Sequence, residues 1–247
     1  MKRIRIGLPL VAMLVMFGTA TFAQNNSDSD AKKKLEELMK QDWACLKCFA
    51  DANSKVEAPK AGEQRVVFMG NSITIGWLRL NPEFFNGKPY INRGISGQTT
   101  PQMLIRFRPD VIDLKPKVVV ILAGTNDIAG NTGYTPVETI FGNIVSMAEL
   151  AKANGIKVVI SSVLPAFDYP WRKGLEPVGK IADLNQRLKN YAAKHNIVYL
   201  DYYSAMADER KGLKAALTSD GVHPNKAGYE VMDPLAEKAI AAALKKK

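Results

Sequence analysis

The feature that most constrains the fold is an alternation of short apolar segments with longer segments of helical periodicity. In the clearest apolar segment, Val118-Val119-Val120-Ile121-Leu122, every residue is apolar, as expected for a strand covered on both faces. Strands are predicted at 65–69, 90–93, 118–122, 157–161 and 197–200. Helices are predicted at 100–108, 136–154, 178–195 and 225–245. This alternation predicts an α/β domain with one five-stranded parallel sheet and helices on both faces.

The 247 residues are predicted to contain one such domain, at 63–247, preceded by two shorter segments. Residues 24–62 are expected to hold a polar linker and an extra N-terminal helix. That helix is predicted at 29–54, because apolar residues recur there at spacings of three and four, and its apolar face is expected to dock on the domain.

Residues 1–23 have the pattern of a signal peptide. A basic start is followed by 12 apolar residues, Ile6 to Phe17, too few to span a bilayer comfortably as a helix. Thr21-Phe22-Ala23 offers small residues for cleavage before Gln24. We therefore expect an exported protein, periplasmic or secreted, with no membrane span after cleavage. The alternative is an uncleaved N-terminal anchor.

The formal net charge of +10 falls to +7 if the three basic residues of this signal segment leave. Part of the remaining excess lies in two lysine runs, 32–34 and 245–247. The rest is scattered, without the stripe of arginines and aromatic residues typical of nucleic-acid binding. Composition therefore favours a solvated basic surface and no nucleic-acid partner.

Cys45 and Cys48 are the two cysteines of the chain, in a Cys-x-x-Cys arrangement. A reactive pair of this kind normally places its first thiol at a helix N-terminus, where the dipole lowers its pKa. Here the pair falls inside a helical pattern, and two ligands cannot close a zinc site. The pair is predicted to be structural, either as two thiols or as a local disulfide. A redox role is the remaining alternative.

Polar motifs follow four of the predicted strands, where each strand ends. They are Gly70-Asn71-Ser72-Ile73-Thr74, the loop from Asn92 to Thr100, Gly124-Thr125-Asn126-Asp127, and Ser161-Ser162-Val163-Leu164-Pro165. In open parallel sheets, ligands bind beyond the C-terminal ends of the strands. The four loops are therefore expected to converge on one functional rim.

A serine and a histidine at opposite ends of the chain can form a nucleophile and its base. Ser72 lies at a predicted strand-to-helix turn, and a serine hydroxyl needs a neutral imidazole to accept its proton. The chain has two histidines. His223 is favoured because Asp220, three residues earlier, can orient its ring. His195 is instead predicted to end a helix. For Asp220 the alternative is a turn or capping role.

Three groups are candidates for stabilising the oxyanion of acyl transfer. The backbone N–H of Ser72 is predicted at a helix start, and Gly97 allows a second N–H to approach without a Cβ in the way. Asn126 can add a side-chain amide. Taken alone, Gly97 and Asn126 are ordinary turn residues. Their places after successive strands favour an oxyanion hole.

In order along the chain, these motifs resemble the four blocks of the SGNH/GDSL hydrolase family. The resemblance extends from about Arg65 to the C-terminus and includes the Asp220-Gly221-Val222-His223-Pro224 block. It implies a flavodoxin-like three-layer sandwich and ester or thioester hydrolysis with no metal and no cofactor. It also implies Ser72, Asp220 and His223 as the triad. One departure is Asn71, where the family usually has aspartate; activity should survive, because that residue is not the base.

Within the family, the strand-end loops resemble those of platelet-activating-factor acetylhydrolases and carbohydrate acetylesterases most closely. Trp77, Tyr169 and Trp171 are candidates for binding a sugar ring, although large aromatic residues are as often buried for packing. The expected substrate is a small-molecule or oligosaccharide ester, most often an acetyl ester. The alternatives are a lipid- or thioester-directed acylhydrolase and a non-catalytic glycan-binding module.

Overall fold

The computed structural model describes residues 30–246 and divides the chain into two compact units, Met1–Asp42 and Trp43–Lys247. In the first unit, residues 30–40 form a helix. The predicted signal segment, 1–23, lies outside the described residues. Within residues 30–246, no helix is long and apolar enough to cross a bilayer.

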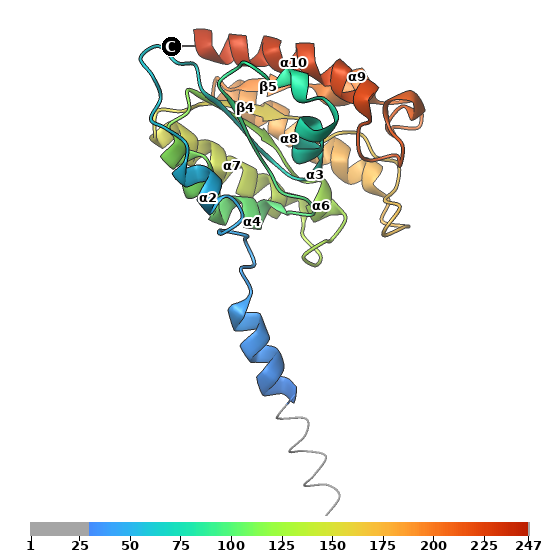
Figure 1. Ribbon diagram of the computed structural model, residues 1–247. Coiled ribbons are helices and arrows are strands. Elements are labelled where there is room, and N and C mark those ends of the chain that lie inside the picture. Colours follow the sequence, from blue (N-terminus) through green and yellow to red (C-terminus); the bar gives the residue numbers. More distant parts are fainter. Residues whose placement is uncertain (1–29, 247) are drawn as a thin grey trace, which may run out of the picture. The chain divides into compact units, whose positions relative to one another are not determined.

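The second unit is built on a five-stranded sheet in which all pairings are parallel (Figure 1). Its strands are β1 (Val66–Gly70), β2 (Tyr90–Gly94), β3 (Val118–Leu122), β4 (Lys157–Ser161) and β5 (Val198–Leu200). They lie in the order β2-β1-β3-β4-β5, the flavodoxin-like order. The predicted fold class is confirmed, and the predicted strands match the observed ones to within one residue at each end.

Alternate residues of the central strands point into two separate cores, because successive strand side chains face opposite sides of a sheet. In β3, Val119 and Ile121 belong to one core, whereas Val118, Val120 and Leu122 belong to the other. All five are at most 5% exposed. This burial on both faces explains why the strand sequence is continuously apolar.

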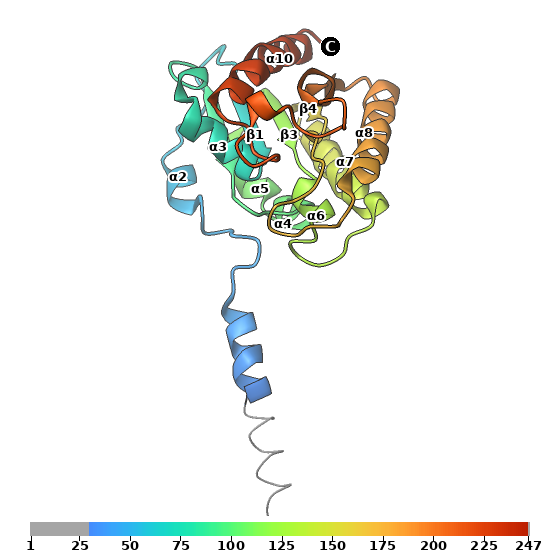
Figure 2. The same cartoon turned by 90° about the vertical axis from the view of Figure 1, so that its right-hand side faces the viewer.

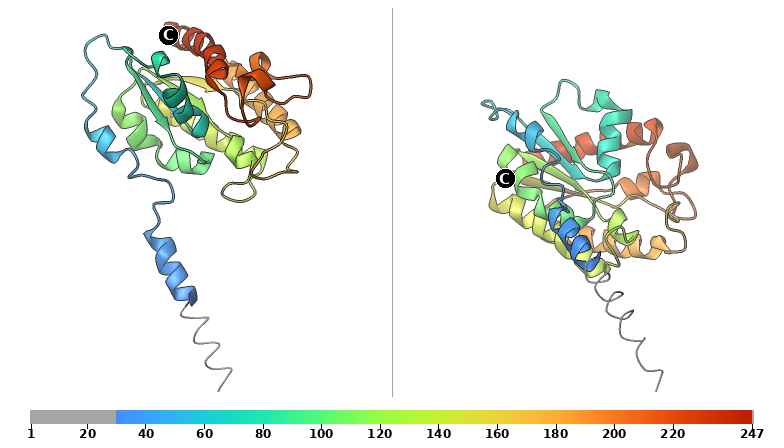
Figure 3. Two further views of the ribbon diagram at one scale, coloured as in Figure 1. Left: turned by 45° about the vertical axis from the view of Figure 1, so that its right-hand side comes forward. Right: turned by 60° about the horizontal axis from the view of Figure 1, so that its bottom comes forward.

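Two helical layers cover the sheet (Figure 2). The longer helices are α3 (Ser72–Leu80), α7 (Val137–Ala153), α8 (Pro177–Lys194) and α10 (Lys226–Lys245). The shorter ones are α2 (Ala50–Ser54), α4 (Thr100–Ile105), α5 (Phe107–Asp110), α6 (Thr125–Ile128) and α9 (Tyr202–Met206). Buried residues of α3, α9 and α10 share one core, and those of α4, α5, α7 and α8 share the other. Both views of Figure 3 keep the red α10 and the yellow-green α7 on opposite sides of the sheet.

The predicted single helix at 29–54 is wrong, because two separate helices stand there. One ends at residue 40, and α2 begins at Ala50. Between them Cys45 has a left-handed backbone (φ +59°), which an α-helix cannot include, and it forms a disulfide with Cys48. Whether the first of these helices docks on the domain stays a prediction.

The strand order also bears on where the expected functional rim lies. The chain passes from β1 to β2 on one side of β1 and returns to β3 on its other side. At such a switch point the loops leaving neighbouring strands diverge and open a crevice at the strand ends. Ser72 begins α3, directly after β1, and Asn126 lies in α6, directly after β3.

Candidate active site

Ser72 stands at a tight junction between β1 and α3. Gly70 ends the strand, Ser72 begins the helix, and the side chain of Asn71 accepts a hydrogen bond from the backbone N–H of Ile73 at 3.0 Å. Asn71 thus caps the helix, a role for which asparagine and aspartate are about equally suited. Gly94, at the end of β2, packs so closely that a Cβ there would come within 2.8 Å of the Asn71 backbone oxygen. The turn that carries Ser72 is therefore held by packing as well as by its cap.

The structure brings Ser72, His223 and Asp220 into one line of hydrogen bonds. Ser72 Oγ lies 2.9 Å from His223 Nε2, and His223 Nδ1 lies 2.7 Å from Asp220 Oδ2. The serine and the histidine are 151 residues apart in the chain. These distances lie within the range required for a nucleophile, its base and the group that orients the base.

Asp220 is kept ionised by its surroundings. Burial raises its pKa, but hydrogen bonds from the backbone and ring of His223, and from the backbone of Val222, outweigh that effect and leave the pKa of Asp220 below its ordinary value. The two backbone N–H groups donate to Oδ1 at 2.7 Å and 2.9 Å. One carboxylate oxygen therefore fixes the loop, and the other is left for the imidazole.

The three candidate oxyanion donors line the pocket that contains Ser72 and His223. The backbone N–H groups of Ser72 and Gly97 have no partner among the residues that the structure describes. Gly97 has φ +77°, a left-handed conformation that favours glycine. Nδ2 of Asn126 donates one hydrogen bond to the backbone oxygen of Gln98 at 2.9 Å, which leaves its second N–H for a ligand.

Asp127 locks the neighbouring loop in place. Its carboxylate accepts hydrogen bonds from the backbone N–H of Thr100 at 3.0 Å and from the Thr100 hydroxyl at 2.6 Å. Burial raises the pKa of Asp127 to about 6, and the Thr100 hydrogen bonds oppose that rise. The loop after β3 is thus tied to the start of α4.

Of the three aromatic residues predicted to bind substrate, only Trp171 lines the pocket. Trp77 is 1% exposed, and its indole stacks on Phe84 with ring centroids 4.5 Å apart. Tyr169 is fully buried, and its ring supports Trp171 at 5.2 Å. The expectation that Trp77 and Tyr169 contact substrate is therefore wrong: both serve the core. Trp171 is 44% exposed, and its ring centroid lies 5.8 Å from that of His223.

The pocket has a volume of about 770 Å³ and holds residues that the sequence motifs did not indicate. Asn131 donates to the backbone oxygen of Gly97 at 3.2 Å and accepts from the indole N–H of Trp171 at 3.4 Å. It therefore joins the loop that carries Gly97 to the exposed ring of Trp171. Arg79 lines the same pocket from α3. No motif marks either residue, because both depend on contacts distant in sequence.

Two other sequence expectations find their places away from this pocket. The fourth loop, from Ser161 to Pro165, does not line it. The side chain of Asn185 in α8 instead accepts from the backbone N–H of Val163 at 2.7 Å and donates to its backbone oxygen at 3.0 Å, which holds this loop against α8. His195 is the C-cap residue of α8 and contacts the ring of Tyr191. Among residues 30–246, no three histidine, cysteine or acidic side chains are grouped as a metal site requires.

The arrangement has the parts that acyl transfer needs. A hydroxyl lies against an imidazole, the imidazole lies against a carboxylate, and unpaired N–H groups line the same pocket. Such donors stabilise the negative charge that develops on a carbonyl oxygen during attack.

Known proteins are similar to this chain in structure or in sequence. A GDSL-like lipase from Bacteroides thetaiotaomicron has a TM-score of 0.79 and 51% identity, over 81% of this chain and 98% of that one. An acetylxylan esterase from Xylanibacter ruminicola is 26% identical over 77% of this chain, and platelet-activating factor acetylhydrolase IB subunit alpha2 of Rattus norvegicus is 28% identical over 72%. The match to the acetylhydrolase subunit covers 77% of the rat protein.

Two of the matches cover less than half of the relative's own length. The match spans 45% of the acetylxylan esterase and 42% of a Bacillus subtilis lipoprotein, YqeF, to which 49% of this chain is 33% identical. Residues 68–231 match the model of the GDSL-like Lipase/Acylhydrolase family, and this segment includes Ser72, Gly97, Asn126 and the Asp220-to-His223 turn. The chain therefore belongs to the GDSL-like lipase/acylhydrolase family.

Proposed function

We propose that this protein is an exported serine esterase that removes small acyl groups, chiefly acetyl, from carbohydrate esters. The observation that carries the proposal is the unbroken line of hydrogen bonds from Ser72 through His223 to Asp220, in a pocket with unpaired N–H donors. An imidazole held by an ionised carboxylate presents its other nitrogen to the hydroxyl as an acceptor.

The proposed reaction has two halves. Ser72 Oγ attacks the ester carbonyl carbon as its proton passes to His223 Nε2, and the carbonyl oxygen takes up negative charge opposite the N–H groups of Ser72, Gly97 and Asn126. The sugar oxygen leaves with the proton from His223, and the acyl group stays on Ser72. Water then attacks this acyl-enzyme by the same route and releases the free acid and the serine.

The pocket wall supports a carbohydrate as the leaving group. Trp171 presents an exposed ring beside His223, where the departing alcohol must collect its proton. Asn131 and Arg79 add hydrogen-bond donors to the same wall. An amphipathic aromatic ring beside polar groups suits a ligand with apolar faces and many hydroxyls. The relationship to an acetylxylan esterase agrees with this choice.

An acetate-release assay on acetylated oligosaccharides tests the reaction and the nucleophile together. Wild-type protein should release acetate, and Ser72→Ala should release none above the uncatalysed rate. Ser204→Ala is a matched control, since that serine lies on α9 and does not line the pocket. Activity that survives in Ser72→Ala would exclude the proposed nucleophile, and inactive wild-type protein on all acetyl esters would favour a glycan-binding module.

Trp171→Ala tests the carbohydrate part of the proposal. KM for acetylated oligosaccharides should rise about tenfold, equivalent to roughly 1.4 kcal/mol of binding, whereas kcat/KM for nitrophenyl acetate should change little. Phe167→Ala is the control, because that residue has similar exposure but does not line this pocket. Equal losses on both substrates would argue against a sugar site at Trp171.

A lipid- or thioester-directed acylhydrolase is the second candidate, favoured by Ile75 and Leu80, which add apolar side chains to the pocket. Nitrophenyl acetate and nitrophenyl octanoate separate the two candidates. The acetylesterase predicts the higher kcat/KM on acetate, and a preference for octanoate would favour the lipid-directed enzyme.

The basic and apolar pattern of residues 1–23 supports the exported part of the proposal. Fractionation of cells that express the full chain tests it. Export predicts a processed protein, beginning at Gln24, in the periplasm or the medium, and full-length protein retained in the cytoplasm would contradict it.

A further inference from the structure

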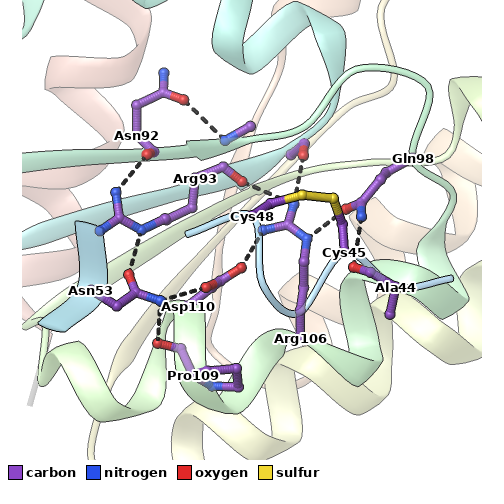
Figure 4. A network of polar contacts seen from close by, with 12 residues as sticks. Ala44, Cys45, Cys48, Asn53, Asn92, Arg93, Gln98, Arg106, Pro109 and Asp110 are labelled. Carbon is purple, nitrogen blue, oxygen red and sulfur yellow. Dashed lines mark hydrogen bonds and ion pairs between the residues drawn. A yellow bond between two sulfur atoms is a disulfide. The ribbon is translucent and has the colours of Figure 1, made fainter. Parts of the chain in front are cut away.

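Gln98 is a buried residue next to the candidate oxyanion donor Gly97, and its side chain connects the loop between β2 and α4 to two other parts of the chain (Figure 4). Its Nε2 donates to the backbone oxygen of Ala44 at 2.9 Å, and its Oε1 accepts from Nε of Arg106 at 2.5 Å. Its own backbone oxygen accepts the hydrogen bond from Nδ2 of Asn126. Gln98 therefore holds the candidate oxyanion amide and is itself held at both ends of its side-chain amide.

Arg106 fixes the strand ends around this point. Its side chain is fully buried. Nη2 donates to the backbone oxygen of Gly70, at the end of β1, at 3.0 Å, and to that of Arg93, in β2, at 2.9 Å. Gly70 stands two residues before Ser72. One guanidinium thus joins the strand that leads to the nucleophile, the strand that leads to the oxyanion loop, and Gln98.

Residues 43–54, here called the N-terminal brace, enclose this network from outside the sheet. Ala44 is 4% exposed and supplies the oxygen that Gln98 binds. The disulfide between Cys45 and Cys48 closes the turn that begins at the next residue, and its backbone hydrogen bond runs from the Cys48 N–H to the Cys45 oxygen at 3.1 Å. The disulfide therefore restricts the backbone next to Ala44, whose oxygen binds Gln98.

The other end of the brace contacts the same buried charges. Asn53 of α2 accepts a hydrogen bond from Nε of Arg93 at 2.9 Å and donates to Oδ1 of Asp110 at 2.7 Å. Asp110 Oδ2 in turn accepts from Nη1 of Arg106 at 2.9 Å. The brace is thus bound to the network at two separate points (Figure 4).

We propose that Gln98 and Arg106 are positioning residues for the oxyanion hole, and that the disulfide-bonded N-terminal brace holds them in place. This inference rests on the proposed function. Asn126 has two amide hydrogens, and the bond to the Gln98 oxygen uses one, so the direction of the second follows the position of that oxygen. Stabilisation of an oxyanion needs donors that are already aligned before attack.

A double-mutant cycle on the full chain tests this role. Gln98→Met keeps the volume but removes both side-chain hydrogen bonds, and should lower kcat on nitrophenyl acetate by about 10- to 100-fold with KM within threefold. The loss falls below the ~100- to 1,000-fold typical of removing an oxyanion donor. If Gln98 acts through Asn126, the double variant Gln98→Met/Asn126→Ala should be as slow as Asn126→Ala alone. The proposal would be overturned if the fold-losses in kcat of the two single variants multiplied in the double variant. An unchanged kcat in Gln98→Met would overturn it as well.

Arg65→Gln is the matched control for Arg106→Gln. Arg65 is 6% exposed at the opposite end of β1, and it too binds two backbone oxygens, those of Leu114 at 2.8 Å and Glu57 at 2.9 Å. Both variants should lower the melting temperature, but only Arg106→Gln should lower kcat at a temperature where both are fully folded. Equal kcat values in the two variants would show that Arg106 is only structural.

The disulfide is tested with Cys45→Ser/Cys48→Ser, which also serves if the Gln98 variant does not fold. We expect kcat at least threefold below wild type, with KM within twofold, measured where circular dichroism shows native structure. Wild-type kcat would overturn the role of the brace. Ser72→Ala keeps the two proposals apart: if it retains activity, the proposed function fails; if it is inactive while Gln98→Met keeps kcat, only the positioning role fails.

Discussion

At the scale of single residues, Asp127 makes the free energy of unfolding depend on pH. In the folded chain the pKa of this buried carboxyl is raised to about 6, from an ordinary value of 3.8, chiefly by desolvation. Between these two values the folded protein keeps a proton that the unfolded chain has lost. Stability from this group is therefore fully present below about pH 4 and is lost as pH rises through about 6.

Asp127→Asn should remove that loss, since asparagine cannot ionise but its oxygen can still accept from Thr100. The unfolding free energy of the variant, minus that of wild type, should rise with pH between about 4 and 6, by at most ~1.4 kcal/mol per pH unit, and then level off. Urea titrations at a series of pH values measure this difference. A difference that does not vary with pH would show that Asp127 does not titrate in that window.

Replacing two buried tyrosines by phenylalanine should change the free energy of unfolding in opposite directions. The hydroxyl of Tyr202 is buried without a hydrogen-bond partner among the described residues, whereas that of Tyr229 donates to the backbone oxygen of Ile73 at 2.8 Å. Tyr202→Phe should raise the unfolding free energy by about 1 kcal/mol, and Tyr229→Phe should lower it by about the same amount. Chemical denaturation of both variants checks the signs. Two shifts in the same direction would contradict the assignment.

At the scale of elements, α3 and α10 together set the distance between serine and histidine. Ser72 begins α3, and His223 lies three residues before α10. Asp233 of α10 accepts hydrogen bonds from the indole N–H of Trp77 at 2.9 Å and from Nδ2 of Asn81 at 2.8 Å. Asp233 thus joins α10 to the end of α3, so Trp77 supports the site from inside the core.

Asp233→Ala should therefore lower both stability and kcat. Glu237→Ala is the comparison variant: Glu237 lies one turn further along α10 and binds Lys88 and Tyr90, at the edge of the sheet away from the triad. Leaving the buried donors of Trp77 and Asn81 without this partner should cost about 1–3 kcal/mol of stability and several-fold in kcat. Glu237→Ala should keep wild-type kcat. If Asp233→Ala also keeps it, the helix pair does not control the triad geometry.

The sequence predicted the elements well and their tertiary partners poorly. The sheet was predictable because strands buried on both faces leave continuous apolar runs, as in β3. Ser72, Asp220 and His223 were predictable because local turn chemistry sets them apart. Arg106 and Gln98 were not predictable, since half of the hydrogen-bond partners of each side chain are backbone oxygens, which any sequence supplies. The prediction of substrate contact was wrong for Trp77 for a related reason. Trp77 and Trp171 differ in which side chains pack over them, and the sequence does not reveal those neighbours.

At the scale of the whole molecule, the residues of the candidate site all lie in the unit Trp43–Lys247. The N-terminal brace belongs to this unit, although the sequence assigned it to a separate docking helix. The division between the units falls directly before the brace, so every residue of the network lies in the second unit.

A chain that begins at Trp43 should therefore fold and keep kcat/KM for nitrophenyl acetate within about twofold of the full chain. Deleting residues 43–49 as well removes Ala44 and the disulfide, and should lower kcat more than KM. Steady-state kinetics of both truncations, with circular dichroism as the folding check, decides the matter. A large loss on removing residues 1–42 alone would mean that the first unit takes part in the site.

The most direct test of the central claim is the rate at which an active-site phosphonate labels the folded protein. Because the hydroxyl must pass its proton to the imidazole, wild-type protein should take up one label, on Ser72, and His223→Ala should react at least about 1,000-fold more slowly. Peptide mapping by mass spectrometry locates the label. A label on another residue, or equal rates in wild type and His223→Ala, would contradict the account.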